Sequence, residues 1–278
     1  MNKKHVDYVS LFLKAITYLA SIITILILFL IIAYILIRGI PNLKPSLFSW
    51  TYTTENVSML PSIINTIFVV IITLLMAGPI GVFSAVYLVE YAKKGSKLVK
   101  LILLTTETLA GIPSIVYGLF GSLMFVISLR FGLSLLSGSL TLAIMVLPTI
   151  LRTTQEALIA VPDTYREASF GLGAGKIRTI FKIILPAAWP GILSGLVLSM
   201  GRIVGETAAL IYTSGTLSKA SFDLMKPGST LAVHMYKLMS EGLYTDQACA
   251  VAVVLLLFVI LMNGISSYLG NRFAKGNE

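Results

Sequence analysis

The chain has 278 residues, of which 56% are hydrophobic and only 12% are charged, and its mean hydropathy is +0.92. Soluble domains usually carry about 25% charged residues, so this composition indicates an integral membrane protein. The net charge of +9 could suit nucleic acid. In a membrane protein, such an excess more often reflects orientation and anionic lipid headgroups. The single cysteine, Cys249, excludes an intramolecular disulfide, and no group of His, Cys, Asp and Glu residues has metal-ligand spacing.

Six apolar segments predict an all-α, polytopic membrane protein. A helix needs about 20 apolar residues to cross the hydrocarbon core. The segments that meet this length are residues 15–37, 62–89, 101–129, 133–151, 187–213 and 248–269. The first is interpreted as a retained helix, because its apolar core is longer than that of a signal peptide and no small-residue cleavage site precedes Arg38. Proline and glycine at 78–81 and 111–113 are compatible either with broken helices that line a pathway or with simple packing kinks.

Lysine and arginine are distributed unequally between the two sets of loops. Fourteen of the 21 fall at the N-terminus, at 93–100, at 152–182 and near the C-terminus, six fall in the opposite loops, and Arg202 lies within a span. Positive charge collects on the cytoplasmic side. We therefore expect both termini and the long loop 152–186 in the cytoplasm, and loops 41–60 and 214–247 outside.

The inner loop 152–186 contains a short helix signal. Pro162 ends the segment before it, and Thr164 and Glu167 have the spacing of a capping box, so a helix is expected to begin at Thr164. Glycines at 171, 173 and 175 then end it. The segment is compatible with an ordinary surface loop or with a docking site, in which the small residues Ala168 and Ser169 allow another backbone to approach and Glu167 offers a charge.

Residues 171–176 superficially resemble a phosphate-binding loop. A P-loop needs four residues between its glycines and a lysine followed by serine or threonine. Here Gly175 comes only four positions after Gly171, and Ile177 follows Lys176. If ATP drives this protein, a different chain is expected to bind it.

The same loop carries a longer pattern. Glu167, Ala168 and Ser169 are followed after three residues by Gly173, and after nine more by Ile183, Ile184, Leu185 and Pro186. This pattern resembles the EAA loop of bacterial ABC-importer permeases, and Ser169 is its one departure, small for small. Segments 110–120, 147–154 and 201–210 are similar to the phosphate-specific permeases of the PstA type.

The resemblance implies a type I ABC-importer (MetI-like) transmembrane fold and a transport subunit that is not itself an enzyme. It implies that residues 1–59 form an N-terminal cytoplasmic segment, the first transmembrane helix and an outer loop. Residues 60–270 would form the permease domain, with the EAA loop at 163–186, and residues 271–278 a cytoplasmic tail. Glu167, Ala168, Ser169 and Gly173 would couple to the ATPase.

The implied partners lie on both sides of a bacterial cytoplasmic membrane. They are a homologous permease of the PstC type, two ATPase subunits of the PstB type that bind ATP and Mg, and an external phosphate-binding protein of the PstS type. Inorganic phosphate would be the substrate, membrane lipid would surround the chain, and no nucleic acid is involved.

Arg202 and Glu206 are charged residues within the fifth apolar segment. A helix that begins near Pro190 places Arg202 about 18 Å along its axis, where a lone arginine costs at least about 2.5–3.5 kcal/mol. The i,i+4 spacing puts both charges on one helical stripe with Gly191, Gly195 and Leu198, and a neighbouring small-residue stripe at 201, 205 and 208 suits helix packing. The charged stripe is therefore expected to face the bundle interior or the partner permease, and not lipid. Two interpretations remain open: a structural ion pair, or a substrate-pathway site in which Arg202 meets phosphate and Glu206 orients it.

Two further charged residues and three alternative functions fit the sequence less well. Glu107 is a weaker second candidate partner for Arg202, and Arg152 is expected to extend toward headgroups. A channel or secondary transporter would not need an EAA loop, and no catalytic pair supports a membrane enzyme. A permease for sulfate or molybdate cannot be separated from a phosphate permease by the EAA loop alone.

Overall fold

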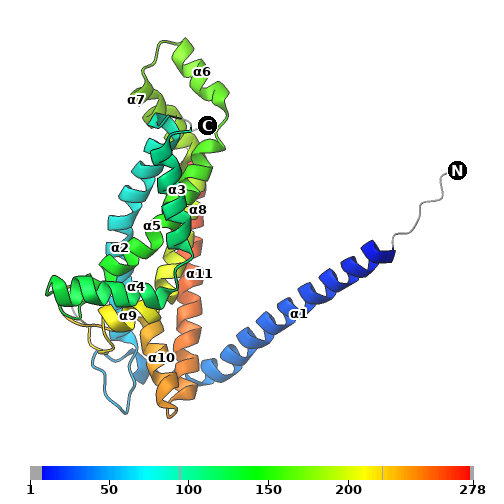
Figure 1. The fold of residues 1–278 in the computed structure, drawn as a ribbon. Helices are drawn as coiled ribbons and strands as arrows, with labels where there is room; N and C mark the ends of the chain where they lie inside the picture. Colours follow the sequence, from blue (N-terminus) through cyan, green and yellow to red (C-terminus); the bar gives the residue numbers. More distant parts are fainter. Residues whose placement is uncertain (1–7, 94, 221, 276–278) are drawn as a thin grey trace.

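The computed structural model describes residues 8–93, 95–220 and 222–275, and every regular element in these ranges is helical (Figure 1). The longer helices are α1 (Tyr8–Gly39), α2 (Leu60–Val86), α3 (Lys97–Ala110), α5 (Leu135–Ile159), α8 (Leu185–Gly205), α10 (Leu231–Glu241) and α11 (Thr245–Lys275). Shorter helices are α4 (Ser114–Gly121), α6 (Asp163–Gly171), α7 (Lys176–Thr179) and α9 (Ala208–Thr213). Short 3₁₀ segments are η1 (Ile40–Asn42) and η2 (Pro45–Phe48), and π-helical segments are η3 (Tyr87–Tyr91), η4 (Ser122–Ser128) and η5 (Ile180–Ile184).

The expected membrane spans are present, but one of them is bent. Five stretches of the described chain are long and apolar enough to cross a membrane: Val9–Asn42, Leu60–Tyr91, Leu135–Ile159, Lys176–Gly205 and Thr245–Ile265. A sixth is obtained if α3 and α4 with η4 count as one span, and these two parts meet at 102°. The six apolar segments of the sequence therefore correspond to six structural units.

Two of the predicted spans are not single helices. The expected helix 101–129 breaks between α3 and α4, where Pro113 precedes α4 in an extended conformation (φ −59°, ψ 141°). Proline lacks a backbone N–H and disfavours a helical conformation at the residue before it, so it favours a break at this position. The expected helix 187–213 breaks at Glu206, which is extended (φ −73°, ψ 130°) and separates α8 from α9. Pro79, in contrast, lies within a continuous α2.

Other boundaries also differ from the sequence-based ranges. Helix α5 continues to Ile159, eight residues into the predicted inner loop, and α10 lies within the predicted outer loop 214–247. The predicted tail begins as a continuation of α11 through Lys275. Residues 1–7 and 276–278 lie outside the described part of the chain.

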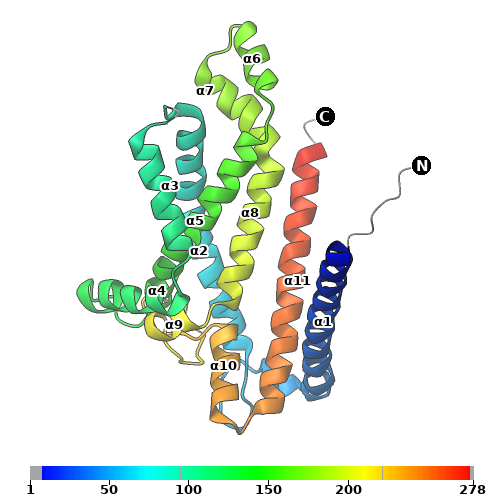
Figure 2. The same ribbon diagram turned by 45° about the vertical axis from the view of Figure 1, so that its right-hand side comes forward.

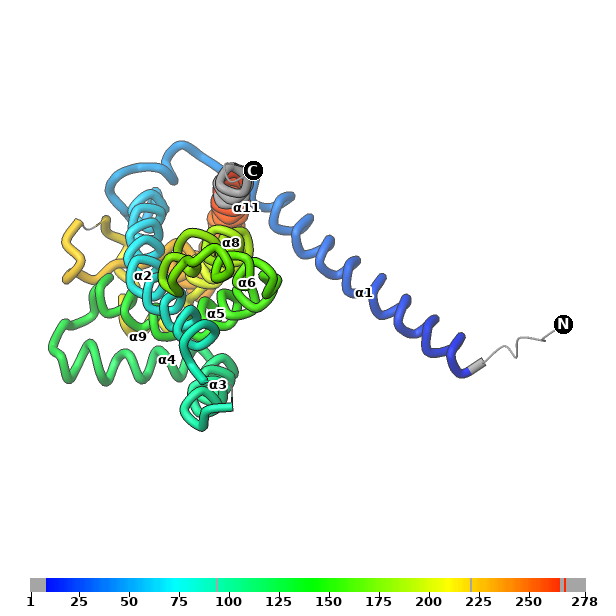
Figure 3. Tube along the Cα trace, turned by 90° about the horizontal axis from the view of Figure 1, so that it is seen from above, coloured from blue at the N-terminus to red at the C-terminus, as the bar shows by residue number. Residues whose placement is uncertain are grey.

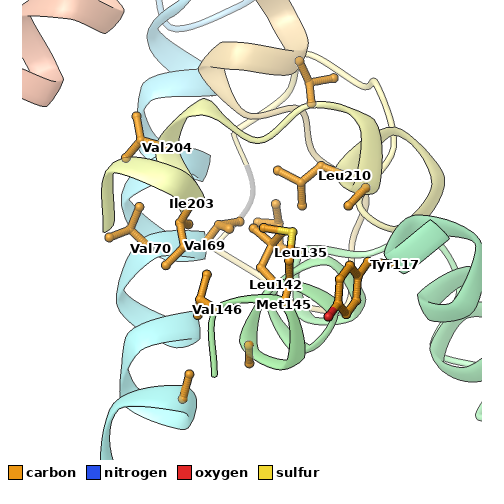
Figure 4. Packing of buried hydrophobic residues seen from close by; sticks show 14 of the residues in the cluster. Val69, Val70, Tyr117, Leu135, Leu142, Met145, Val146, Ile203, Val204 and Leu210 are labelled. Carbon is orange, nitrogen blue, oxygen red and sulfur yellow. The ribbon is translucent and has the colours of Figure 1, made fainter. Parts of the chain in front are cut away.

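The core forms where α2, α5 and the α8–α9 break meet. Val69, Leu142, Val146, Ile203 and Leu210 are each at most 1% exposed and belong to one cluster (Figure 4). Glycine allows the helices to approach closely, since a Cβ added to Gly81 of α2 would lie 2.7 Å from Cγ2 of Ile150 on α5. The spacing of apolar and small residues on these helices thus selects their packed faces.

The long helices place the inner and outer loops at opposite ends of the bundle. Helices α6 and α7 and the end of α11 lie at one end, and α10 lies at the other (Figures 1 and 2). Helix α1 contacts α11 near Gly39 and then diverges from the bundle (Figure 3). None of the most apolar window of α1 is buried within this chain.

A buried polar network joins the end of α2 nearest Leu60 to α10. The Nδ1 of His234 lies 3.2 Å from the Ser218 hydroxyl, Ser229 donates to Ser218 at 3.5 Å, and Ser229 lies 3.0 Å from Ser62 on α2. His234 is fully buried, and the edge of Tyr52 packs against its ring. Burial lowers the pKa of His234 from 6.5 to about 4; the Val57 backbone raises this pKa and the Lys237 charge lowers it, both by less.

This pKa predicts a pH-dependent stability. His234 stays neutral in the fold while an unfolded histidine binds a proton below about pH 6.5, so stability is complete above pH 6.5, falls between pH 6.5 and about 4, and levels off below. The loss is about 3 kcal/mol. His234→Gln removes this contribution, so thermal unfolding in detergent should show a smaller decrease in Tm from pH 7 to 4.5 for the variant. Equal decreases in both proteins would contradict the assignment.

Candidate functional site

The inner loop forms two short helices joined by a glycine turn. Helix α6 begins directly after Pro162, which has no side-chain cap, so the predicted capping box of Thr164 and Glu167 is wrong. Proline at this position fixes the backbone for helix entry, and Asp163 in the first turn complements the helix dipole. The prediction of a short helix in this loop is confirmed, but its N-cap residue is Pro162 and not Thr164.

The glycines end α6 as predicted. Helix α6 ends at Gly171, and Gly173 has φ +80°, a conformation that other residues adopt only with strain. The amide of Gly173 donates to the Phe170 carbonyl at 2.9 Å, and that of Ala174 donates to the Ser169 carbonyl at 3.1 Å. The chain therefore reverses within a few residues and enters α7.

The predicted coupling residues do not share one exposed face. Glu167, Ala168 and Gly173 are exposed, but Ser169 is only 3% exposed, and its hydroxyl lies 2.8 Å from that of Thr179. The expectation that Ser169 admits an approaching partner is therefore wrong, because its small side chain packs α6 against α7.

The loop exposes several large apolar side chains. Leu172 is 90% exposed, Ile177 66%, and Tyr165, Phe170 and Phe181 are each about half exposed. Ile180 and Ile184 of the same segment are buried. The five exposed residues are called the loop patch: Tyr165, Phe170, Leu172, Ile177 and Phe181. Several large apolar side chains exposed on one short loop are compatible with a protein interface, whose buried centre is apolar.

Sequence analysis also missed Arg166 of α6. Its guanidinium donates to Oε1 of Glu90 at 2.7 Å from Nη2 and at 3.1 Å from Nε, and both side chains are largely buried. The partners are 76 positions apart, so no local motif could have indicated the pair.

The second candidate region is the break between α8 and α9. Oε1 of Glu206 accepts hydrogen bonds from the amides of Thr207 and Ala209, each at 3.2 Å. Glu206 is 9% exposed. Its carboxylate therefore satisfies amides that the break leaves without a helical partner. The predicted continuous stripe with Arg202 is wrong, because the chain becomes extended at Glu206.

Arg202 lies in the last turn of α8 and is partly buried. Gly191 and Gly195 on the same stripe face α5, since a Cβ added to either would lie within 2.6 Å of Ala157 or Thr153. These two glycines thus face the bundle interior, one of the two orientations predicted for the stripe, whereas Leu198 on the same stripe is 61% exposed. Arg202 lies near enough to Tyr117 of α4 to interact with it electrostatically. Within the described ranges, no ion pair joins Arg202 to a carboxylate.

The two helix breaks lie next to each other. Helix α4 crosses α9 so closely that a Cβ on Gly118 would lie 2.8 Å from Cα of Ala209. The neighbouring Tyr117 hydroxyl donates to the Leu109 carbonyl at 2.8 Å, in the last turn of α3. In contrast, Gly201 has open space at its Cβ position. The predicted small-residue stripe at 201 and 205 therefore makes no close helix contact within the described chain.

The two other charged candidates have separate environments. Glu107 is exposed and lies in the last turn of α3, beside the break and not at the start of the span. Arg152 pairs with Glu156 one turn later at 3.1 Å, and both are exposed. The search of the described residues finds no group of His, Cys, Asp and Glu that could hold a metal ion. The chemistry available at the breaks is therefore hydrogen bonding and charge.

Similar solved structures match this arrangement of helices. A MetNI methionine ABC transporter in an inward-facing conformation aligns with a TM-score of 0.61 and 19% identity, over 87% of this chain and 97% of the other. A bacterial ABC transporter involved in import of the acidic polysaccharide alginate aligns with a TM-score of 0.62 and 15% identity, over 93% and 96%. At these identities the comparison establishes the fold, which is the MetI-like fold of type I importers.

Sequence relatives cover most of the chain. The probable ABC transporter permease protein YqgI of Bacillus subtilis is 32% identical, over 87% of this chain and 88% of the relative. The phosphate transport system permease protein PstA of Pasteurella multocida is 34% identical, over 81% of each. Some relatives are longer, and the chain covers only 33% of a PstA homolog of Mycoplasma pneumoniae at 35% identity. The family described as binding-protein-dependent transport system inner membrane component matches residues 77–275, and this chain belongs to it as an ABC transporter permease subunit.

Proposed function

We propose that this chain is the permease subunit of an ATP-driven importer that moves inorganic phosphate into the cell. The observation that carries this proposal is the environment of Arg202. Arg202 lies in the last turn of α8, just before the break at Glu206, and interacts electrostatically with Tyr117 near the other break. The Glu206 carboxylate accepts hydrogen bonds from backbone amides at the start of α9. An arginine in this position offers planar, multidentate donors that suit a phosphate oxyanion. Relatives named PstA support phosphate as that anion.

Arg202 would lower the barrier for the anion to leave the binding protein and pass the break. Transport does not require tight binding at such a site, because the substrate must also leave. Glu206 belongs to the same proposed pathway but acts indirectly, since its carboxylate holds the start of α9 beside Arg202. Sulfate or molybdate would be attracted by the same charge, so the substrate test below includes them.

The inner loop would couple this pathway to ATP hydrolysis. Glu167, Ala168 and the loop patch are exposed on α6 and α7, while Ser169 and Gly173 maintain the shape of the loop. An ABC permease works with an ATPase and a substrate-binding protein. We propose that these are of the PstB and PstS types, that ATP and Mg bind the ATPase, and that a PstC-type permease completes the pore.

The orientation proposal places both termini and α6 in the cytoplasm. Six passes return the chain to its starting side, and α6 and the end of α11 lie at the same end of the bundle (Figure 1). The excess of lysine and arginine at this end supports the cytoplasm as its location.

Arg202 can be tested separately from Glu206. Arg202→Gln should reduce phosphate uptake by about 10- to 100-fold, because a hydrogen bond from a charged donor contributes about 1.5–3 kcal/mol. Glu206→Gln retains an oxygen that accepts both amides and should transport almost normally, whereas Glu206→Leu should impair assembly. The measurement is uptake into vesicles that contain the assembled complex, with sulfate and molybdate as competitors. Normal uptake by Arg202→Gln would contradict the pathway role, and strong competition by sulfate or molybdate would contradict phosphate as the substrate.

The docking role of the loop patch can be tested at Leu172. Leu172→Asp places a charge on a residue that is 90% exposed, so the permease should fold but lose most of its co-purifying ATPase. Leu243→Asp is the matched control, because Leu243 is 81% exposed at the opposite end of the bundle. Equal ATPase recovery with both variants would show that α6 is not the docking site.

The orientation can be tested with the same two positions. In a Cys249→Ala background, Leu243→Cys should react with a membrane-impermeant thiol reagent in intact cells. Leu172→Cys should react only after the cells are permeabilised. Labelling of position 172 in intact cells would reverse the orientation.

A further inference from the structure

Arg166 is the centre of a hydrogen-bond cluster at the cytoplasmic end of α2. Besides its two contacts with Glu90, it donates to the Leu158 carbonyl at 3.1 Å, to the Val161 carbonyl at 3.0 Å and to Asp163 at 3.0 Å. Arg166 and Glu90 side chains are 16% and 9% exposed, whereas Asp163 is 81% exposed. The guanidinium thus joins three elements: α6, the end of α5 and the end of α2.

The burial of this pair distinguishes it from the surface ion pairs. Pairs between exposed residues, such as Arg152 with Glu156, contribute little because water screens them. A buried pair restricts its partners more strongly, since removing one charge leaves the other unpaired in a poorly hydrated site. Movement of α6 away from α2 would have the same effect. The two elements are therefore constrained to move together.

A second contact reinforces the attachment from the other half of the loop. The Nζ of Lys176, the first residue of α7, lies 4.6 Å from the centre of the Tyr91 ring. Tyr91 follows Glu90 in η3. Both helices of the loop therefore contact the same short segment at the end of α2.

Among the described residues, Arg166 and Ser169 are the side chains of α6 that hydrogen-bond to other elements. Ser169 bonds to Thr179, which belongs to the same loop. Arg166 thus provides the side-chain connection between α6 and the transmembrane helices.

Helix α2 continues from this contact to the opposite end of the bundle. Leu60–Tyr91 is one span of 32 residues, or about 48 Å at 1.5 Å per residue. At its outer end, the Leu231 amide donates to Thr66 at 2.8 Å, and Asn65 donates to the Ser229 carbonyl at 3.1 Å. One helix therefore contacts both the inner loop and the outer loop that leads into α10.

We propose that the Glu90–Arg166 pair is the link through which movement of α6 is transmitted to α2 and from there to the outer loop. This inference rests on the proposed function, in which an ATPase docks on α6. Arg166 and Glu90 are positioning residues in this scheme, since neither contacts the substrate. Their removal should leave ATP hydrolysis in place and reduce the transport that each hydrolysis event produces.

The test uses the full complex reconstituted in vesicles with its binding protein. Arg166→Gln and Glu90→Gln should retain the ATPase but lose about tenfold in phosphate transported per ATP hydrolysed, within the usual range of coupling between sites. The double variant should be no worse than the more damaged single variant, because the two groups act as one unit. Arg166→Lys keeps the charge and should be intermediate. Arg178→Gln, which removes an exposed charge from the same loop without touching the cluster, is the matched control.

Several outcomes would overturn the link. A normal transport ratio in both single variants would do so, as would additive losses in the double variant. If Arg166→Gln no longer binds the ATPase, the Arg166→Lys and Glu90→Gln variants are compared instead. If both assemble and transport a normal amount of phosphate per ATP hydrolysed, the pair has only a structural role.

A spectroscopic measurement tests the link without depending on which substrate is transported. Spin labels at Ile71 on α2 and Leu257 on α11, both about half exposed, report the position of α2 when ATP is added. The distance should change in the parent complex and remain unchanged in Arg166→Gln. Absence of phosphate uptake by the parent complex would contradict the proposed function, whereas an identical distance change in Arg166→Gln would contradict the link alone.

Discussion

A helix that breaks within a membrane must satisfy the backbone groups that the break exposes. Hydrocarbon offers no hydrogen bonds, so each unsatisfied amide or carbonyl costs several kcal/mol. Both breaks in this chain meet the requirement with a side chain. Glu206 accepts from two amides at the start of α9, and Tyr117 donates to a carbonyl at the end of α3. Each break thus has at least one freed backbone group that a side chain satisfies.

The region of the two breaks also contains Arg202, in the last turn of α8. The two breaks place short helices across the bundle, and Gly118 lets α4 lie directly against α9. Glu206 is used by the backbone, so its negative charge is held at the start of α9 and does not form an ion pair with Arg202. Polar groups therefore gather where irregular backbone lies within the bundle, as expected for a transport pathway.

The loop that contains α6 also depends on side-chain contacts for its shape. Helix α6 is too short to be stable alone, and it is held by Arg166 on one side and by the contact between Ser169 and Thr179 on the other. These anchors leave Glu167, Ala168 and Leu172 exposed. A rigid, partly apolar surface of this kind suits a partner that must push or pull on the bundle, because a loose loop would absorb the movement.

The sequence by itself determined the membrane class, the six apolar units, the charge asymmetry and the family. These properties depend on composition, segment length and fixed local spacing, which neighbouring residues specify. It also predicted a short helix in the inner loop and its end, since the glycines restrict the backbone directly, although the capping box that marked its start is not formed. The proline and glycine near 111–113 were visible as well, but they allowed either a kink or a break.

Only the tertiary structure decided which of these occurred and which groups became partners. Whether a chain can break at Pro113 or Glu206 depends on side chains that satisfy the freed backbone groups and on a neighbouring helix that covers them. Ser169 was expected to be open to a partner, yet Thr179 ten positions later encloses it. Glu90 and Arg166 meet across 76 positions because α2 and α6 converge at one end of the bundle. Local spacing carries no information about such contacts, since they arise from the packing of whole helices.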